Sequence, residues 1–76
     1  MVNLFDRHVG TRIKSLRLEM RLSQSQLAKS ARVDATSIAA FEAGTMRADA
    51  ETLLHIANAL NVSLSSFFEG LNVDDR

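Results

Sequence analysis

The chain has 76 residues, nine basic and nine acidic side chains, and no cysteine or proline. A chain this short forms one small domain with a modest core, and without cysteine it has neither disulfides nor thiolate metal sites. It also lacks the ~20 consecutive apolar residues of a membrane span and the basic and apolar segments of a secretory signal, so we expect a cytoplasmic protein without a membrane partner.

The first predicted helix covers about residues 6–20. Its apolar residues Val9, Ile13, Leu16 and Met20 recur at helical spacing, which places them on one face. No segment of the sequence alternates convincingly between apolar and polar residues, as a half-buried strand would. The sequence therefore predicts an all-α fold.

Cap residues mark where the later helices begin. Ser23 is followed three residues later by Gln26, the spacing of a capping box, so a second helix is expected to start near residue 24. Asp34, Asp49 and Ser63 are expected to cap further helices that start near residues 35, 50 and 64.

Two glycines predict where helices end. We expect Gly44 to adopt a left-handed conformation after the third helix and Gly70 to do the same after the fifth. The prediction is a compact five-helix domain over residues 1–76, with a core of about residues 6–70 and a polar tail over residues 71–76.

The second and third helices are each two to three turns long, and helices this short are marginal in water unless they pack. A tight connection over residues 31–34 joins them, which is the arrangement of a helix-turn-helix. Leu27, Ile38 and Phe41 are among the apolar residues expected to pack the pair.

Three segments carry a recognisable pattern: "RIKSLRLEMRLSQSQLA" (12–28), "V-D-x-x-S-I-x-x-F-E-x-G" (33–44) and "TLLHIANALNVSLSSFF" (52–68). Together they resemble the phage repressor/Cro, or Xre-type, family of helix-turn-helix proteins over about residues 8–69. The resemblance implies a lambda-repressor-like domain that places its third helix in the major groove of double-stranded DNA, usually as a dimer. Restriction–modification controller proteins are family members of similar size.

The resemblance also implies which residues meet DNA. Ala35, Thr36 and Ala40 match positions that contact base edges, and Ser37 matches a position that contacts the backbone. Gln24 matches a glutamine that donates to a phosphate and steadies the start of the third helix. The complete set of predicted DNA-binding residues is Gln24, Ser25, Arg32, Ala35, Thr36, Ser37, Ala40, Thr45 and Arg47.

The third helix is rich in Ala, Ser and Thr, which cannot pair with bases as Gln, Asn or Arg do. Methyl groups can pack on thymine, and small side chains let the backbone approach the groove closely. We therefore expect a large share of readout through DNA shape and phosphate contacts. The alternative is a helix that no longer reads DNA, because alanine forms helices well without any other role.

Two arginines depart from the family pattern. Arg21 and Arg32 occupy turn positions where the family commonly has glycine, and an arginine in the left-handed conformation costs on the order of 1 kcal/mol. Either the turns differ here or the charges compensate by meeting phosphate. Residues 1–47 hold eight basic and four acidic residues, which suits an anionic partner; the alternative is an unevenly charged solvated surface.

Arg17 and Glu42 match an arginine–carboxylate pair that joins the first and third helices in the family. We interpret the pair as structural, because no nucleophile or second perturbed carboxylate accompanies it. His8 and His55 have no cysteine or acidic cluster near them in sequence, so no metal site is expected. The sequence predicts no enzyme, no cofactor and no small-molecule ligand.

The C-terminal part is expected to form a dimer interface. Leu54, Phe68 and Leu71 cannot all join one small core, and an exposed apolar patch commonly marks an interface. The alternative is that the last helix folds back and covers them. A two-fold dimer would set two third helices about 34 Å apart and require a palindromic site.

The predicted function is a sequence-specific transcriptional regulator, most often a repressor, that binds a palindromic operator as a homodimer in the cytoplasm, at the nucleoid. A dual activator–repressor is also compatible with the resemblance to controller proteins. A second hypothesis is an antitoxin or protein-interaction module that uses the apolar face of the C-terminal helix. A third is the DNA-binding part of a longer chain, against which the polar ending "EGLNVDDR" argues mildly.

Overall fold

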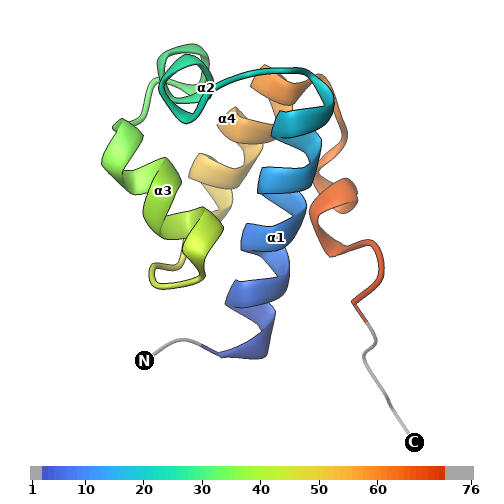
Figure 1. Cartoon of the computed structure of the whole chain (residues 1–76). Coiled ribbons are helices and arrows are strands. Elements are labelled where there is room, and N and C mark those ends of the chain that lie inside the picture. Colours follow the sequence, from blue (N-terminus) through green and yellow to red (C-terminus); the bar gives the residue numbers. More distant parts are fainter. Residues whose placement is uncertain (1–2, 72–76) are drawn as a thin grey trace, which may run out of the picture.

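The computed structural model describes residues 3–71, which form four α-helices, one 3-10 helix and, over this range, no strand (Figure 1). The elements are α1 (Leu4–Glu19), α2 (Gln24–Ala31), α3 (Ala35–Ala43), α4 (Ala50–Leu60) and the 3-10 helix η1 (Leu64–Phe68). The prediction of an all-α fold is confirmed, but the predicted fifth α-helix is a 3-10 helix. Apart from Leu71, the predicted polar tail lies outside the described residues.

Side-chain caps set the starts of α2 and α4 as predicted. The Ser23 hydroxyl accepts from the Gln26 amide at 3.0 Å, and the Gln26 side chain accepts from the Ser23 amide at 2.7 Å. The Asp49 carboxylate accepts from the Thr52 amide at 2.8 Å. Each cap satisfies an amide that has no partner inside its helix.

The helix α1 starts earlier than the apolar spacing indicated. Asn3 accepts from the amide of Asp6 through its side-chain oxygen, at 2.8 Å, so the first helical residue is Leu4 rather than a residue near position 6. The apolar pattern does not reveal this start, because the first turn of α1 is mostly exposed.

The expected caps at Asp34 and Ser63 are not formed. In the part of the chain that the structure describes, neither side chain accepts from a first-turn amide, although both backbones are extended as at a helix start. The Ser63 hydroxyl lies instead 2.9 Å from the hydroxyl of Ser65. Such local side-chain hydrogen bonds compete with a regular helix start, and η1 begins without a side-chain cap.

Side chains of α1 hold the carbonyl groups of η1. Arg12 donates through Nε to the Ser66 carbonyl at 2.9 Å, and Nε2 of His8 lies 2.7 Å from the Glu69 carbonyl. Arg12 also forms an exposed ion pair with the Glu69 carboxylate at 3.2 Å. Side chains of α1 thus provide the hydrogen bonds that a following α-helical turn would otherwise give to these carbonyls. The segment forms a short 3-10 helix against α1.

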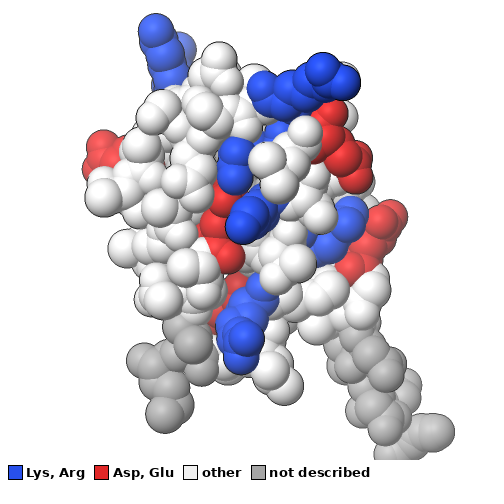
Figure 2. All heavy atoms as spheres, in the orientation of Figure 1, with Lys and Arg blue, Asp and Glu red and all other residues white. Residues whose placement is uncertain are grey.

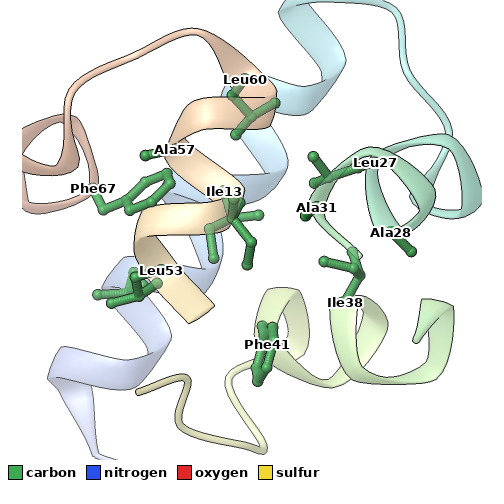
Figure 3. Close-up of a cluster of buried hydrophobic side chains, with 12 residues drawn as sticks. Ile13, Leu27, Ala28, Ala31, Ile38, Phe41, Leu53, Ala57, Leu60 and Phe67 are labelled. Atoms are coloured by element: carbon green, nitrogen blue, oxygen red, sulfur yellow. The ribbon is translucent and has the colours of Figure 1, made fainter. Parts of the chain in front are cut away.

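Each element supplies one of the five largest fully buried side chains: Ile13 from α1, Leu27 from α2, Ile38 from α3, Ile56 from α4 and Phe67 from η1. Figure 3 shows core side chains from all five elements, among them Ile13, Leu27, Ile38 and Phe67. Burying a side chain of this size stabilises a fold by roughly 1.5–3 kcal/mol. The two short central helices therefore owe their stability to packing rather than to their own length.

Helix α1 packs more extensively on α3 than on any other element, and Gly10 makes this possible. A Cβ atom at Gly10 would overlap the Phe41 carbonyl oxygen and lie 2.9 Å from the Glu42 carbonyl oxygen. Glycine is used here for the close approach of two backbones, which brings α3 directly against α1.

Left-handed residues end the helices. Gly44 follows α3 with φ 76°, as predicted, and Gly70 follows η1 with φ 82°. Arg21, Arg32 and Asn61 are also left-handed, with φ between 59° and 61°. The alternative that the two arginine turns differ from the left-handed form is therefore wrong, and each arginine carries a backbone cost of about 1 kcal/mol.

Candidate nucleic-acid interface

The outer face of α3 is small and uncharged. Ala35 and Thr36 are exposed, Ser37 and Ala40 are half-buried, and Ile38 is buried in the core. Figure 2 shows this largely uncharged surface over α3 at the left, with an acidic side chain at its edge, and Lys and Arg side chains interspersed with Asp and Glu down the middle of the same face. Of the three residues that the resemblance assigned to base edges, Ala35 and Thr36 thus lie at the surface, and Ala40 is half-buried.

A buried ion pair supports α3 from behind. Arg17 donates through Nε and Nη2 to the two carboxylate oxygens of Glu42, at 2.6 and 3.0 Å. Its Nη1 donates to the Leu22 carbonyl at 2.6 Å. The two side chains of the pair are 8% and 3% exposed. The hydrogen bond with Glu42 raises the pKa of Arg17, against the opposing effect of burial, so the guanidinium stays charged.

Gln24 joins the same network at the start of α2. Its side-chain nitrogen donates to a Glu42 oxygen at 2.9 Å. The resemblance implied that this glutamine steadies the start of the third helix, whereas the structure places it against a residue near the end of α3. Ser25 follows it in the first turn of α2 and is exposed.

The loop after α3 carries the remaining predicted backbone contacts. The Thr45 hydroxyl donates to the Ala40 carbonyl at 3.2 Å and lies at the surface. Arg47 donates through Nε to the buried Asp6 carboxylate at 2.9 Å, while its own side chain is 61% exposed. The hydrogen bond with Asp6 raises the pKa of Arg47. Nothing in the sequence links these two residues, which are 41 positions apart.

Arg32 lies beside α4. Its exposed side chain lines an open hollow of about 390 Å³ together with Ser30, His55 and Asn58. The structure thus brings Arg32 together with α4 residues that the sequence did not connect to it. Sequence reasoning foresaw no hollow here, because it is formed by packing between α2 and α4.

The predicted interface residues are placed differently from one another. Leu54 is 47% exposed, whereas Phe68 and Leu71 are half-buried. The Phe68 ring stacks on Phe5, with ring centres 5.7 Å apart. Leu4 is also exposed, at 79%. Sequence reasoning missed Leu4 and Phe5, because it started the first helix after them.

Over residues 3–71, no helix is long and apolar enough to cross a membrane. The same range contains no group of three or more His, Cys, Asp or Glu side chains placed to hold a metal ion.

Comparison with known proteins places this geometry in a family. The sequence profile of the helix-turn-helix family HTH_3 matches residues 13–67. An uncharacterized HTH-type transcriptional regulator of Sinorhizobium medicae is 40% identical over 67 residues, which cover 88% of this chain and 48% of the relative. The chain thus spans about half the length of that relative.

Solved structures of similar fold include two restriction–modification controller proteins. C.AhdI from Aeromonas hydrophila superposes with a TM-score of 0.81 at 27% identity, over 83% of this chain and 96% of that one. Wild-type C.Esp1396I superposes with a TM-score of 0.81 at 31% identity, over 88% of this chain and 87% of that one. The motif, the fold and these similarities agree: this chain belongs to the helix-turn-helix (HTH_3, Xre-type) family of DNA-binding transcriptional regulators rather than to a family of enzymes.

Proposed function

We propose that this chain represses transcription by binding a palindromic operator as a homodimer, with α3 in the major groove. The observation that carries the proposal is the outer face of α3, where exposed Ala35 and Thr36 form a small, uncharged surface beside basic side chains that are interspersed with acidic ones (Figure 2). Such a surface fits the groove closely and packs on thymine methyls, while the neighbouring charges face phosphates.

Phosphate contacts are proposed on both sides of α3. Gln24 carries two amide hydrogens; one is used by Glu42, and the other can reach a phosphate. Ser25 adds a hydroxyl at the start of α2, where the helix dipole favours an anion. On the other side, Thr45 and the largely exposed Arg47 face the backbone, and Asp6 holds Arg47 in place.

The similarity to restriction–modification controller proteins supports the proposal, because this chain matches nearly the whole length of C.AhdI. Repression rather than activation is proposed, because a protein bound to an operator blocks RNA polymerase unless the bound protein also contacts the polymerase.

The salt dependence of binding tests the proposal. A site selected from random duplex DNA is titrated with protein by fluorescence anisotropy at several salt concentrations. The logarithm of the binding constant is expected to fall linearly with that of the salt concentration, with a slope of about −0.9 for each phosphate contacted. Arg47→Ala is expected to weaken binding to all sequences and to reduce the slope by about 1.

Asn58→Ala, at an exposed position of α4, serves as the control and is expected to change neither affinity nor slope. Selection of sites without two-fold symmetry would contradict the palindromic operator. Failure to bind any duplex at low salt would contradict DNA binding itself.

The alternative function, an antitoxin or protein-interaction module, is favoured by the exposed apolar side chains of Leu4 and Leu54. Association through such a surface is driven by apolar burial and would persist at high salt, where DNA binding is lost. The same salt series therefore separates the two functions.

A further inference from the structure

Asp34 immediately precedes α3, and its side chain does not cap the helix. Its backbone has the extended conformation of a cap (φ −73°, ψ 143°), yet within residues 3–71 its carboxylate makes no capping hydrogen bond. Ser23 and Asp49, at the starts of α2 and α4, each accept from an amide of their own helix. The Asp34 side chain is exposed, so it remains open to an outside donor.

This carboxylate is the one charge that α3 and its cap can offer to a ligand. Residues 35–43 contain a single charged residue, Glu42, whose oxygens bind Arg17 and Gln24. Glu42 is also almost completely buried. The exposed residues of α3 itself offer only methyl groups and a hydroxyl, so the exposed Asp34 carboxylate is the strongest hydrogen-bond acceptor at the start of this helix.

A carboxylate beside DNA is repelled by the phosphates and by acceptors on the base edges. In the major groove, guanine and thymine present acceptors, adenine presents an amino donor beside its N7 acceptor, and cytosine presents its N4 amino donor alone. Cytosine is therefore the base whose edge suits an aspartate best.

We propose that Asp34 selects cytosine at one position of each operator half-site. This inference rests on the proposed function, because it requires α3 in the major groove. The N-terminal residues of a recognition helix are the ones that contact base edges, and Asp34 directly precedes Ala35 and Thr36. In this arrangement the methyl groups of Ala35 and Thr36 contact thymine, and the Asp34 carboxylate accepts a hydrogen bond from the cytosine amino group.

The test is to select binding sites from random duplex DNA with the wild type, Asp34→Asn and Asp34→Ser. The wild type is expected to select cytosine at one position of each half-site and to bind other bases there roughly tenfold less tightly. Asp34→Asn is expected to prefer adenine at that position, since asparagine pairs with adenine N6 and N7. Asp34→Ser, which keeps a small polar cap residue, is expected to show no preference.

Two controls accompany the selection. Both variants are expected to unfold close to the wild-type midpoint, because the Asp34 carboxylate makes no hydrogen bond to α3. Their salt slopes are expected to equal that of the wild type, because no phosphate contact is lost.

The possible results distinguish a failure of the Asp34 assignment from a failure of the proposed function. If the wild type selects no site, both the proposed function and the role of Asp34 are wrong. If the wild type selects a site without a conserved cytosine, or Asp34→Asn selects the wild-type site unchanged, DNA binding stands and the assignment of Asp34 is wrong.

Discussion

Arg17 joins parts of the chain that are far apart in sequence. Its guanidinium bonds both oxygens of Glu42 on α3 and the carbonyl of Leu22 between α1 and α2. Gln24 completes the network from α2. A buried charge is costly unless it is paired and fully hydrogen-bonded, and here each charge has its partners. The pair therefore holds α3 in a fixed position relative to α1, and so positions the outer face of α3 that is proposed to contact bases.

Removing one partner of this pair is expected to destabilise the fold strongly. Glu42→Ala leaves the Arg17 guanidinium buried without its carboxylate, and such a loss costs about 3–5 kcal/mol. Glu42→Gln keeps the hydrogen-bonding shape and is expected to cost less. Urea unfolding followed by circular dichroism measures both variants. An unfolding midpoint of Glu42→Ala equal to that of the wild type would show that the Arg17–Glu42 pair does not stabilise the fold.

At the level of whole elements, the contact between α1 and α3 depends on a residue without a side chain. Gly10 sits inside α1, where glycine is less favourable than alanine by about 1 kcal/mol. Only glycine fits at this position, because a Cβ atom would overlap the carbonyl oxygen of Phe41 and crowd that of Glu42. Here tertiary packing overrides the helix propensity of the sequence.

Substituting this glycine is expected to destabilise the protein despite the gain in helix propensity. Gly10→Ala forces α1 and α3 apart, and such overpacking costs roughly 1–3 kcal/mol. Ser15→Ala, at an exposed position of the same helix, is the matched control and is expected to be neutral or slightly stabilising. Thermal unfolding compares the two, and a more stable Gly10→Ala variant would show that the backbones can separate without cost.

At the scale of the whole molecule, apolar side chains remain exposed at the surface. Leu4, Met46 and Leu54 are exposed, and Phe5 is partly covered by its stack on Phe68. Of the three residues expected to form an exposed apolar patch, Leu54 is exposed, whereas Phe68 and Leu71 are half-buried. We therefore propose Leu54 as the residue that tests self-association most cleanly.

Leu54→Glu is expected to weaken both self-association and operator binding, because it places a charge in the proposed dimer interface. Leu54 is exposed in the single chain, so the fold itself is expected to survive. Leu18→Glu changes an equally exposed leucine on α1 and is expected to have no effect on association. Sedimentation at micromolar concentration measures the oligomer, and a monomeric wild type would contradict the homodimer.

Local signals in the sequence predicted most of the helices and very little about how they meet. The starts of α2 and α4, and the end of α3 at Gly44, followed from cap residues that act within one turn. The pairing of Arg17 with Glu42 was anticipated through family resemblance alone. The Asp6–Arg47 pair had no sequence signal, because its members lie on different elements.

The sequence by itself determined the all-helical fold and the helix-turn-helix, since apolar spacing and capping act over a few residues, and the family followed from the resemblance of its motifs. The tertiary structure alone decided that the last element is a 3-10 turn held by Arg12 and His8, and that Phe68 stacks on Phe5. These outcomes depend on which surfaces come together when the core forms. Contacts between residues distant along the chain exist only after packing, so no local pattern can encode them.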